Sequence, residues 1–221
     1  MSAFLDAWDD HFTATQRKWL DAEGEALRGL VAELGDGVDV ADIGCGVPRR
    51  VLQHVDPDRF ASYTGFDSDP RVVAVARECY PRAPYYFPDA ADYRVALPLV
   101  QHERGKRFDL AICLSNSLGT FSGDRGEHLL SMAQHADALF VSVVGRGWRI
   151  LQARLEYYQQ NRINCGVDWG TETISSELWG ESHSFTSEYL RAYGLLLGED
   201  GFRPPRVVTA GEMGLCLIVR R

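Results

Sequence analysis

An aspartate and two glycines follow an apolar run early in the chain, in the segment Val38-Asp-Val-Ala-Asp-Ile-Gly-Cys-Gly46. Glycines in a tight turn let a ligand approach the backbone closely, and the carboxylate of Asp42 can attract a cation. A NAD-binding turn reads G-x-G-x-x-G and presents helix amides to a pyrophosphate. Here Val47 and Pro48 follow the second glycine and the third glycine is missing. The turn therefore predicts a cofactor site and disfavours NAD.

Acidic and small polar residues also end the following apolar runs. Gly65-Phe-Asp67 ends the next apolar run. An acidic residue at that position accepts hydrogen bonds from ribose hydroxyls both in enzymes that bind NAD and in enzymes that bind S-adenosylmethionine. Phe87-Pro-Asp-Ala90 and the polar segment 115–120 end two more apolar runs. Open α/β sheets bind ligands at the carboxyl ends of their strands, so these segments predict an adenosine cofactor.

These motifs resemble those of the class I S-adenosylmethionine (SAM) dependent methyltransferases, and within them the small-molecule N-methyltransferases related to glycine N-methyltransferase. The resemblance covers residues 36–144 and implies SAM as cofactor and S-adenosylhomocysteine as product. Ser115 departs from the glycine expected before Asn-Ser-Leu-Gly in these relatives, and Pro48 departs from the usual third glycine. The resemblance implies a cofactor-binding set at the strand ends: Asp42, Gly44 and Gly46 around the methionine part, Asp67 at the ribose, Asp89 and Ala90 at the adenine, Ser115 and Asn116 near the sulfonium, and Cys45 and Ser68 as their neighbours.

A sulfonium is already an activated leaving group, so such an enzyme mainly aligns donor and acceptor and excludes water. No nucleophile, triad or metal signature is needed, and none is found in the sequence. Candidate catalytic residues are Asn116, Tyr157 and His183. Tyr157 shares a predicted helix with Arg154, which could hold a substrate carboxylate, but helical spacing favours a core aromatic and a solvated charge.

Histidines titrate near neutral pH and are candidates for a general base. His183 and His11 could serve this way or lie plainly on the surface. His128 and His135, seven residues apart on a predicted helix, are expected to be exposed.

Short β-branched runs alternate with helical stretches along most of the chain. Repeated β-α units predict a parallel sheet, because parallel strands need crossover connections. Right-handed crossovers then give a Rossmann-like α/β fold with a seven-stranded, mostly parallel, doubly wound sheet. The predicted strands are 38–43, 62–66, 85–87, 108–114, 138–144, 205–209 and 213–220, and the predicted helices include 69–80, 124–136, 147–163 and 187–198.

Leu5, Trp8 and Phe12 begin a helical pattern over residues 5–34, which predicts an N-terminal helical lid or a packing helix. A loosely alternating segment at 167–181 predicts a hairpin. We expect a single domain of residues 1–221, made of a lid (1–35), a SAM-binding core (36–144), a substrate-side helix and insertion (145–186), and a C-terminal helix with closing strands (187–221).

The composition narrows the range of partners. A formal net charge of −8 over 221 residues disfavours nucleic acid and anionic membranes. Without a signal peptide or a membrane-spanning run, the cytoplasm is the expected location. Five widely spaced cysteines predict free thiols and no metal site. A homodimer stays open, because Trp169 and Trp179 could pack between subunits or wall a substrate pocket.

The sequence therefore predicts a SAM-dependent methyltransferase for a small metabolite or natural product, with nitrogen the favoured acceptor atom. Three alternatives stay open. The same pocket could serve a SAM-dependent enzyme that does not methylate, such as a cyclase. A NAD(P)-dependent oxidoreductase is disfavoured by the missing glycine and by the lack of a Tyr-x-x-x-Lys pair. A non-catalytic SAM-binding protein would keep the fold without turnover.

Overall fold

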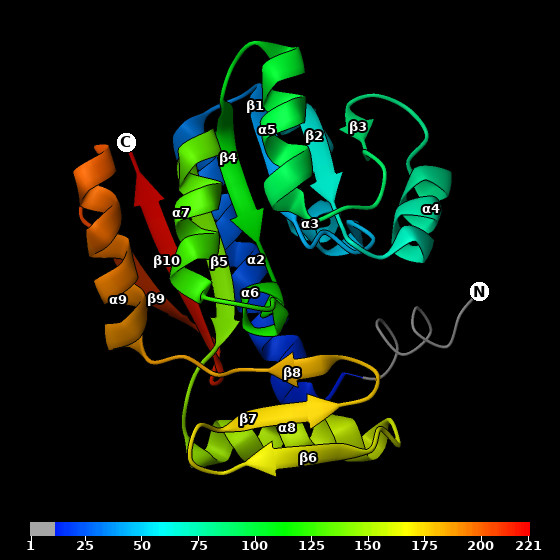
Figure 1. Ribbon diagram of the computed structural model, residues 1–221, viewed down its shortest axis with the longest axis vertical. Helices are drawn as coiled ribbons and strands as arrows, with labels where there is room; N and C mark the ends of the chain where they lie inside the picture. Colours follow the sequence, from blue (N-terminus) through cyan, green and yellow to red (C-terminus); the bar gives the residue numbers. More distant parts are fainter. Residues whose placement is uncertain (1–11) are drawn as a thin grey trace.

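The computed structural model describes residues 12–221 and contains a seven-stranded sheet in the order β3-β2-β1-β4-β5-β10-β9 (Figure 1). Strands β1 to β5 are parallel to one another, whereas β10 is antiparallel to both β5 and β9. This confirms the predicted Rossmann-like, mostly parallel sheet. The strands are β1 (Val38–Ile43), β2 (Phe60–Phe66), β3 (Tyr85–Tyr86), β4 (Phe108–Cys113), β5 (Ala136–Val144), β9 (Arg206–Ala210) and β10 (Gly214–Arg220).

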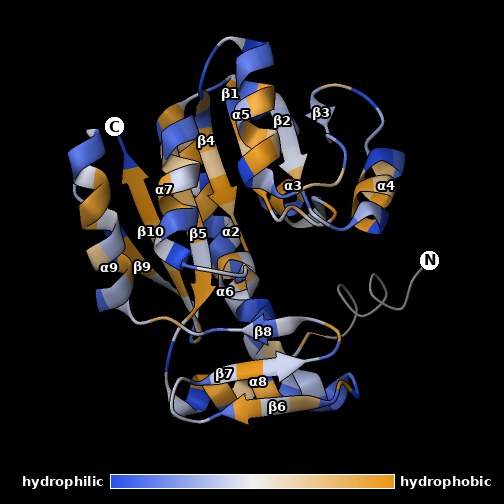
Figure 2. Cartoon of the chain, viewed as in Figure 1, coloured by the Kyte–Doolittle hydropathy of each residue, from blue (hydrophilic) through white to orange (hydrophobic). Residues whose placement is uncertain are grey.

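Helices cover both faces of this sheet, because each face presents a row of apolar side chains. One face packs against α2 (Ala14–Leu34), α3 (Arg49–His54) and α4 (Pro70–Cys79). The other packs against α5 (Tyr93–Arg104), α7 (Arg125–His135) and α9 (Ser187–Leu196). Figure 2 shows the central strands β4, β5 and β10 as largely hydrophobic between these two helical layers.

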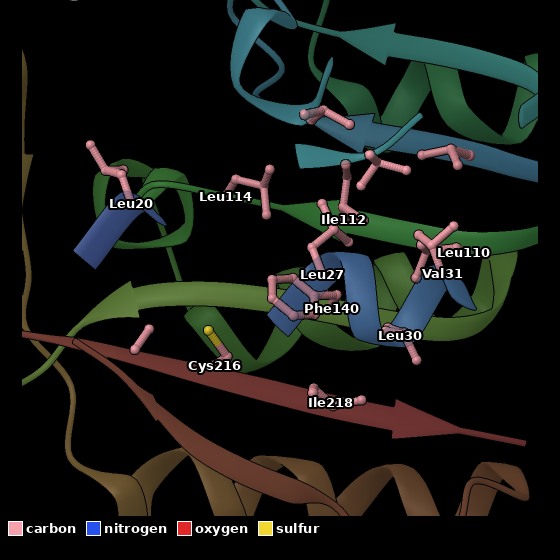
Figure 3. Close-up of a cluster of buried hydrophobic side chains, with 14 of the residues drawn as sticks. Leu20, Leu27, Leu30, Val31, Leu110, Ile112, Leu114, Phe140, Cys216 and Ile218 are labelled. Atoms are coloured by element: carbon pink, nitrogen blue, oxygen red, sulfur yellow. The ribbon is translucent and has the colours of Figure 1, made fainter. Parts of the chain in front are cut away.

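Helix α2 is the N-terminal helix that the sequence predicts, and its apolar stripe lies on the centre of the sheet. A capping box between Thr13 and Gln16 starts the helix. Each large apolar side chain buried there contributes about 1.5–3 kcal/mol. Figure 3 shows Leu27, Leu30 and Val31 of α2 beside Leu110 and Ile112 of β4, Phe140 of β5 and Ile218 of β10. Leu20 belongs to the same buried cluster. The predicted positions Leu5, Trp8 and His11 lie outside the described residues.

A second layer lies beyond the carboxyl ends of β4 and β5 (Figure 1). It consists of α8 (Trp148–Gln160) and a three-stranded antiparallel sheet of β6 (Cys165–Asp168), β7 (Thr173–Ser176) and β8 (Gly180–Ser182). The predicted hairpin at 167–181 is thus one strand short of the observed sheet. Ile174 of β7 packs on Leu151 and Tyr158 of α8, and this small apolar cluster holds the layer together.

Helices α3, α5 and α6 are among the elements whose bounds the sequence does not predict. Helix α5 begins at an N-cap, Asp92, whose side chain accepts a hydrogen bond from the Arg94 amide. Helix α6 (Ser117–Thr120) is a single short turn in the polar segment after β4. None of the helices in residues 12–221 is both long and apolar enough to cross a membrane.

Candidate functional site

Asp42 is the penultimate residue of β1, and its carboxyl group is buried, with a relative exposure of 2%. The hydroxyl of Tyr63, on the adjacent strand β2, donates a hydrogen bond to it. Burial raises the pKa of Asp42 to about 7, and the neighbouring carboxylates of Asp67 and Glu23 add to this shift, while the Tyr63 hydrogen bond opposes it. A cation bound nearby would favour the ionised form, so this end of the sheet is suited to a positively charged ligand.

The two glycines after Asp42 adopt left-handed backbone angles, with φ of 71° at Gly44 and 56° at Gly46. The amides of Gly44 and Cys45 both donate to the Phe66 carbonyl at the end of β2, at 2.8 and 3.1 Å. A Cβ atom at Gly44 would lie 3.0 Å from the Cβ atom of Ser117, so the turn touches α6. The Cys45 thiol instead points inward, towards Gly65 and Phe87, and its pKa is raised by burial.

Asp67 ties this turn to the end of β2. One of its carboxylate oxygens accepts the Gly46 amide at 3.1 Å and the other accepts the Asp69 amide at 2.9 Å. Burial raises its pKa. The carboxylate is thereby fixed at the end of the strand, and lone pairs remain on both oxygens for hydroxyl donors from a ligand.

A polar cavity of about 420 Å³ opens in front of these strand ends. Its volume lies within the range of about 300–1,000 Å³ that is typical of small-molecule sites. Among the predicted cofactor-binding residues, Gly44, Gly46, Asp67 and Ser68 line it. The remaining lining residues are Phe66, Ala91, Asp92, Tyr93, Arg94, Ser117, Thr120, Phe121, Ser122 and His128.

Asp89 and Ala90 do not line this cavity. The Asp89 side chain is 97% exposed and pairs with Arg77 at 2.8 Å, while Ala90 packs against the core. The Ala91 amide donates to the Asp67 carbonyl at 3.3 Å, which brings the next two residues, Ala91 and Asp92, to the cavity wall instead. The acidic residue at the cavity thus comes three positions later than the one that the sequence predicts.

His128 is buried, with 3% exposure, so the expectation that it is exposed was wrong. Its Nδ1 lies 2.8 Å from the Tyr93 hydroxyl and its Nε2 lies 2.8 Å from the Ser122 carbonyl. Its ring also packs against Phe121, with centroids 5.0 Å apart. The face of α7 that carries His128 is turned towards the cavity, which helical spacing alone does not reveal.

A second, smaller cavity of about 180 Å³ lies between α2 and the α8 layer, and we call it the aromatic cavity. Tyr157 lines it, stacked on Phe12 with ring centroids 5.9 Å apart. Trp179 lines it as well, whereas Trp169 is 60% exposed and packs on Trp148. The other lining residues are Gln16, Trp19, Leu20, Ser115, Asn116, Ser117, Thr120, Val144, Arg154, Tyr158, Ser182 and Met213.

Arg154 lines the aromatic cavity with only 4% of its surface exposed, so the predicted solvated charge was wrong. Its guanidinium donates to the Glu172 carbonyl at 2.8 Å and to the Ser182 carbonyl and hydroxyl, the latter at 3.0 Å. Within residues 12–221 no carboxylate forms an ion pair with it. The strands β7 and β8 fold over α8 and bury this cation, which the sequence pattern of the helix could not predict.

Asn116 lies between the two layers and is buried, with 4% exposure. Its side-chain oxygen accepts the Val144 amide at 3.0 Å, and its Nδ2 donates to the Ser182 hydroxyl at 3.1 Å and the His183 carbonyl at 3.2 Å. These bonds tie the ends of β4, β5 and β8 together. Asn116 therefore positions the wall of the aromatic cavity in this structure.

Glu23 of α2 is a buried residue that the sequence analysis missed. Its carboxylate accepts the Ser115 amide at 2.8 Å and the Ser115 hydroxyl at 3.2 Å. Ser115 and Asn116 have positive φ angles of 52° and 66°, so this contact stabilises an uncommon turn. The sequence did contain a signal for this role, because Glu23 is a charged residue on the apolar face of the predicted amphipathic helix.

His183 lies away from both cavities. Its Nδ1 is 3.1 Å from the Thr173 hydroxyl and its Nε2 is 3.2 Å from the Glu181 carboxylate. Burial and the charge of Arg125 lower its pKa. The structure thus brings Asn116 and Tyr157 to one cavity but does not bring His183 there.

The polar and aromatic cavities share Ser117 and Thr120 of α6 in their walls. A nucleoside-like ligand in the first could therefore present a cationic group towards a second ligand in the other. Within the described residues, no group of three or more His, Cys, Asp or Glu side chains is arranged to hold a metal ion.

No protein-family model and no curated protein matches this chain, but many solved structures share its fold. The magnesium protoporphyrin IX methyltransferase of Synechocystis PCC 6803 with bound SAM superposes with a TM-score of 0.60, at 17% identity, over 100% of this chain and 92% of that one. The 1,6-didemethyltoxoflavin-N1-methyltransferase of Burkholderia thailandensis, with 1,6-didemethyltoxoflavin and S-adenosylhomocysteine bound, gives 0.57 at 19% identity, over 98% and 81%.

A third similar structure, from Rhodobacter sphaeroides, is named for Zn-dependent alcohol dehydrogenases and gives a TM-score of 0.60 at 16% identity, over 91% of this chain and 90% of that one. At such identities the likeness concerns the fold. The chain has the fold of the class I methyltransferases, and the finer resemblance to glycine N-methyltransferase stays a prediction.

Proposed function

We propose that this protein is a SAM-dependent methyltransferase for a small-molecule acceptor. The observation that carries the proposal is the acidic wall of the polar cavity, which Asp67 and Asp92 line beside α6. The buried carboxyl of Asp42 does not line the cavity, but it lies close enough to Asp67 for the two groups to interact electrostatically. SAM carries a sulfonium and an ammonium group, and buried carboxylates attract both. The bound SAM in a structure of the same fold supports this choice of cofactor.

In this proposal SAM supplies an activated methyl group. The protein binds SAM and the acceptor, orients them towards each other and excludes water. Asp67 accepts hydrogen bonds from the ribose hydroxyls. Ala91 and Asp92 take the adenine end, in place of Asp89 and Ala90, because only they reach the cavity wall. Gly44 allows the close approach of the methionine part to the backbone.

The aromatic cavity is the proposed acceptor site, and we propose nitrogen as the acceptor atom. Methylation of nitrogen builds positive charge on the acceptor, which aromatic faces such as those of Tyr157 and Trp179 stabilise. The buried Arg154 guanidinium favours an acceptor that also carries an anionic group, such as a carboxylate. Asn116 and Arg154 position this wall, and His183 has no role in the proposal.

The proposal is tested by calorimetric titration of the protein with S-adenosylhomocysteine, SAM and NAD. We expect saturable binding of the first two and none of NAD. Asp67→Ala should weaken binding by about 10- to 100-fold, because a hydrogen bond to a charged group contributes about 1.5–3 kcal/mol. Asp36→Ala, at an exposed aspartate paired with Arg59, is the matched control and should bind normally.

Transfer of a labelled methyl group from SAM into a mixture of small metabolites separates the remaining alternatives. A labelled product supports methyl transfer. Consumption of SAM without a labelled product indicates a non-methylating SAM enzyme, and binding without consumption indicates a non-catalytic SAM-binding protein. Binding of NAD instead of SAM contradicts the proposal outright.

A further inference from the structure

A third cavity, of about 400 Å³, lies on the other side of the segment that joins β8 to α9. We call it the basic cavity. No residue of its wall also lines the polar or the aromatic cavity. Its wall consists of Gly123, Asp124, Arg125, Arg146, Thr171, His183, Ser184, Phe185, Thr186 and Tyr189.

We propose that the basic cavity binds an oxyanion, the phosphate or carboxylate group of a small molecule distinct from the methyl donor and acceptor. The anchor is Arg125. One Nη donates to the Gly123 carbonyl, but its Nε is buried without a hydrogen-bond partner, and within residues 12–221 no carboxylate forms an ion pair with it. The Nε itself is closed off from the cavity, so an oxyanion there would accept from the outer Nη atoms of this half-buried guanidinium, whose charge has no carboxylate partner within the described residues.

The other charges of the wall leave this preference intact. Arg146 is the second guanidinium, and it is only partly neutralised by Glu172, 3.8 Å away. Asp124 is the one carboxylate in the wall, and it accepts the Glu127 amide at 3.0 Å as the N-cap of α7. Glu181 lies 3.2 Å from the His183 ring. The wall itself therefore contains two cations, Arg125 and Arg146, and one carboxylate, Asp124, which already accepts a hydrogen bond as a helix cap.

A neutral hydrogen-bond donor completes the site. The Ser184 hydroxyl makes only long contacts, of 3.3 and 3.5 Å, with the carbonyls of Glu172 and Thr171. The Thr186 hydroxyl accepts the Tyr189 amide at 3.1 Å, and its own hydrogen bond goes to the neighbouring Glu188 carboxylate. Forked guanidinium donors and a hydroxyl donor around one space match the several acceptor oxygens of a phosphate or carboxylate group.

Adjacent residues of one segment line the two cavities: Ser182 lines the aromatic cavity, and His183 and Ser184 line the basic cavity. Asn116 holds the Ser182 hydroxyl and the His183 carbonyl on one side, while the His183 ring and Ser184 face the basic cavity on the other. The Phe185 amide donates to the Val144 carbonyl at 2.9 Å and fixes the next residue. A ligand in the basic cavity would therefore contact the same segment that closes the aromatic cavity.

The test is a titration followed by amide chemical shifts in NMR, with inorganic phosphate, phenyl phosphate and benzoate as probes and sodium chloride at matched ionic strength as the reference. We expect saturable shifts in Ser184, Phe185 and Thr186 with at least one oxyanion. Stronger binding of the two phosphates than of benzoate assigns a phosphoryl ligand, and the reverse assigns a carboxylate.

Arg125→Gln should weaken binding at least tenfold and Arg146→Gln should weaken it less, because Glu172 already shares that charge. Arg59→Gln removes an exposed arginine paired with Asp36 and should leave binding unchanged. Thermal unfolding checks that each variant is folded. Shifts that do not saturate, or equal affinity in Arg125→Gln and Arg59→Gln, would overturn the proposal. None of these readouts depends on SAM, so the test stands apart from the proposed function.

Discussion

The polar cavity and the aromatic cavity adjoin, yet they are built differently. The polar cavity is lined in part by short stretches at consecutive strand ends, which include Gly44, Asp67 and Asp92, and in part by the rings of Phe121 and His128. The aromatic cavity is lined mainly by large side chains from α2, α8, the loop before β8 and the turn before β10. Strand ends that form a site leave a recognisable pattern of glycines and acidic residues in the sequence. Aromatic side chains that form a site have the same spacing as aromatic residues of the hydrophobic core, so the sequence does not distinguish the two.

The first and largest effect concerns the buried carboxyl of Asp42, whose pKa is about 7 in the folded protein against a reference value of 3.8. The folded state holds a proton that the unfolded chain releases, so this contribution to stability is complete below about pH 4 and is lost as the pH rises to about 7. Asp42→Asn is neutral throughout. Its stability relative to the unmodified protein should therefore rise by roughly 3 kcal/mol between about pH 4 and pH 7.5.

Urea unfolding at several pH values measures this difference. Asp36→Asn, at an exposed aspartate, is the control and should show almost no pH-dependent difference. A constant offset between Asp42→Asn and the unmodified protein across the pH range would show that Asp42 is not held neutral by its burial.

The second effect concerns the packing of the shared wall. A Cβ atom at Gly119 would lie 2.5 Å from Nδ2 of Asn116, so Gly119→Ala should displace that side chain and cost about 2 kcal/mol in the free energy of unfolding. A Cβ atom at Gly29 of α2 would meet no atom within 4 Å, and Gly29→Ala should stabilise by about 0.5–1 kcal/mol through helix propensity. Chemical denaturation of both variants checks the pair. Equal effects would indicate that Asn116 is not a tightly packed link.

The smallest effect distinguishes two aspartates after β3. Asp92→Asn keeps the helix cap but removes a charge from the cavity wall, and it should weaken S-adenosylhomocysteine binding by about tenfold, or roughly 1.4 kcal/mol. Asp89→Asn, at a side chain 97% exposed, should change the affinity less than about twofold. Calorimetry on both variants decides between the aspartate at the cavity wall and the one that the sequence predicts; the opposite ranking would favour Asp89.

Features that depend on local sequence pattern could be predicted, whereas features that depend on contacts between distant elements could not. The order of β-α units and the turn from Asp42 to Gly46 depend on local pattern, and the sheet is confirmed in its predicted form. The position of Asp89 depends on how the chain turns after β3, where Ala91 bonds to Asp67. The burial of Arg154 depends on a second sheet that folds over α8. The position of Asp89 and the burial of Arg154 both depend on interactions between elements far apart in the sequence, so no local sequence pattern predicts them.

Helix α2, near the start of the chain, depends for its packing on β10 at the end. The two elements pack together, and Glu33 at the end of α2 forms ion pairs with Arg220 at 2.8 Å and Arg206 at 3.6 Å. Contacts between such distant segments require a large loop to close before they stabilise anything, which slows folding. During synthesis α2 is made before the strands of the seven-stranded sheet, yet it gains its full packing only once β10 is available. We therefore expect the aromatic cavity, which needs both Trp19 and Met213, to form late.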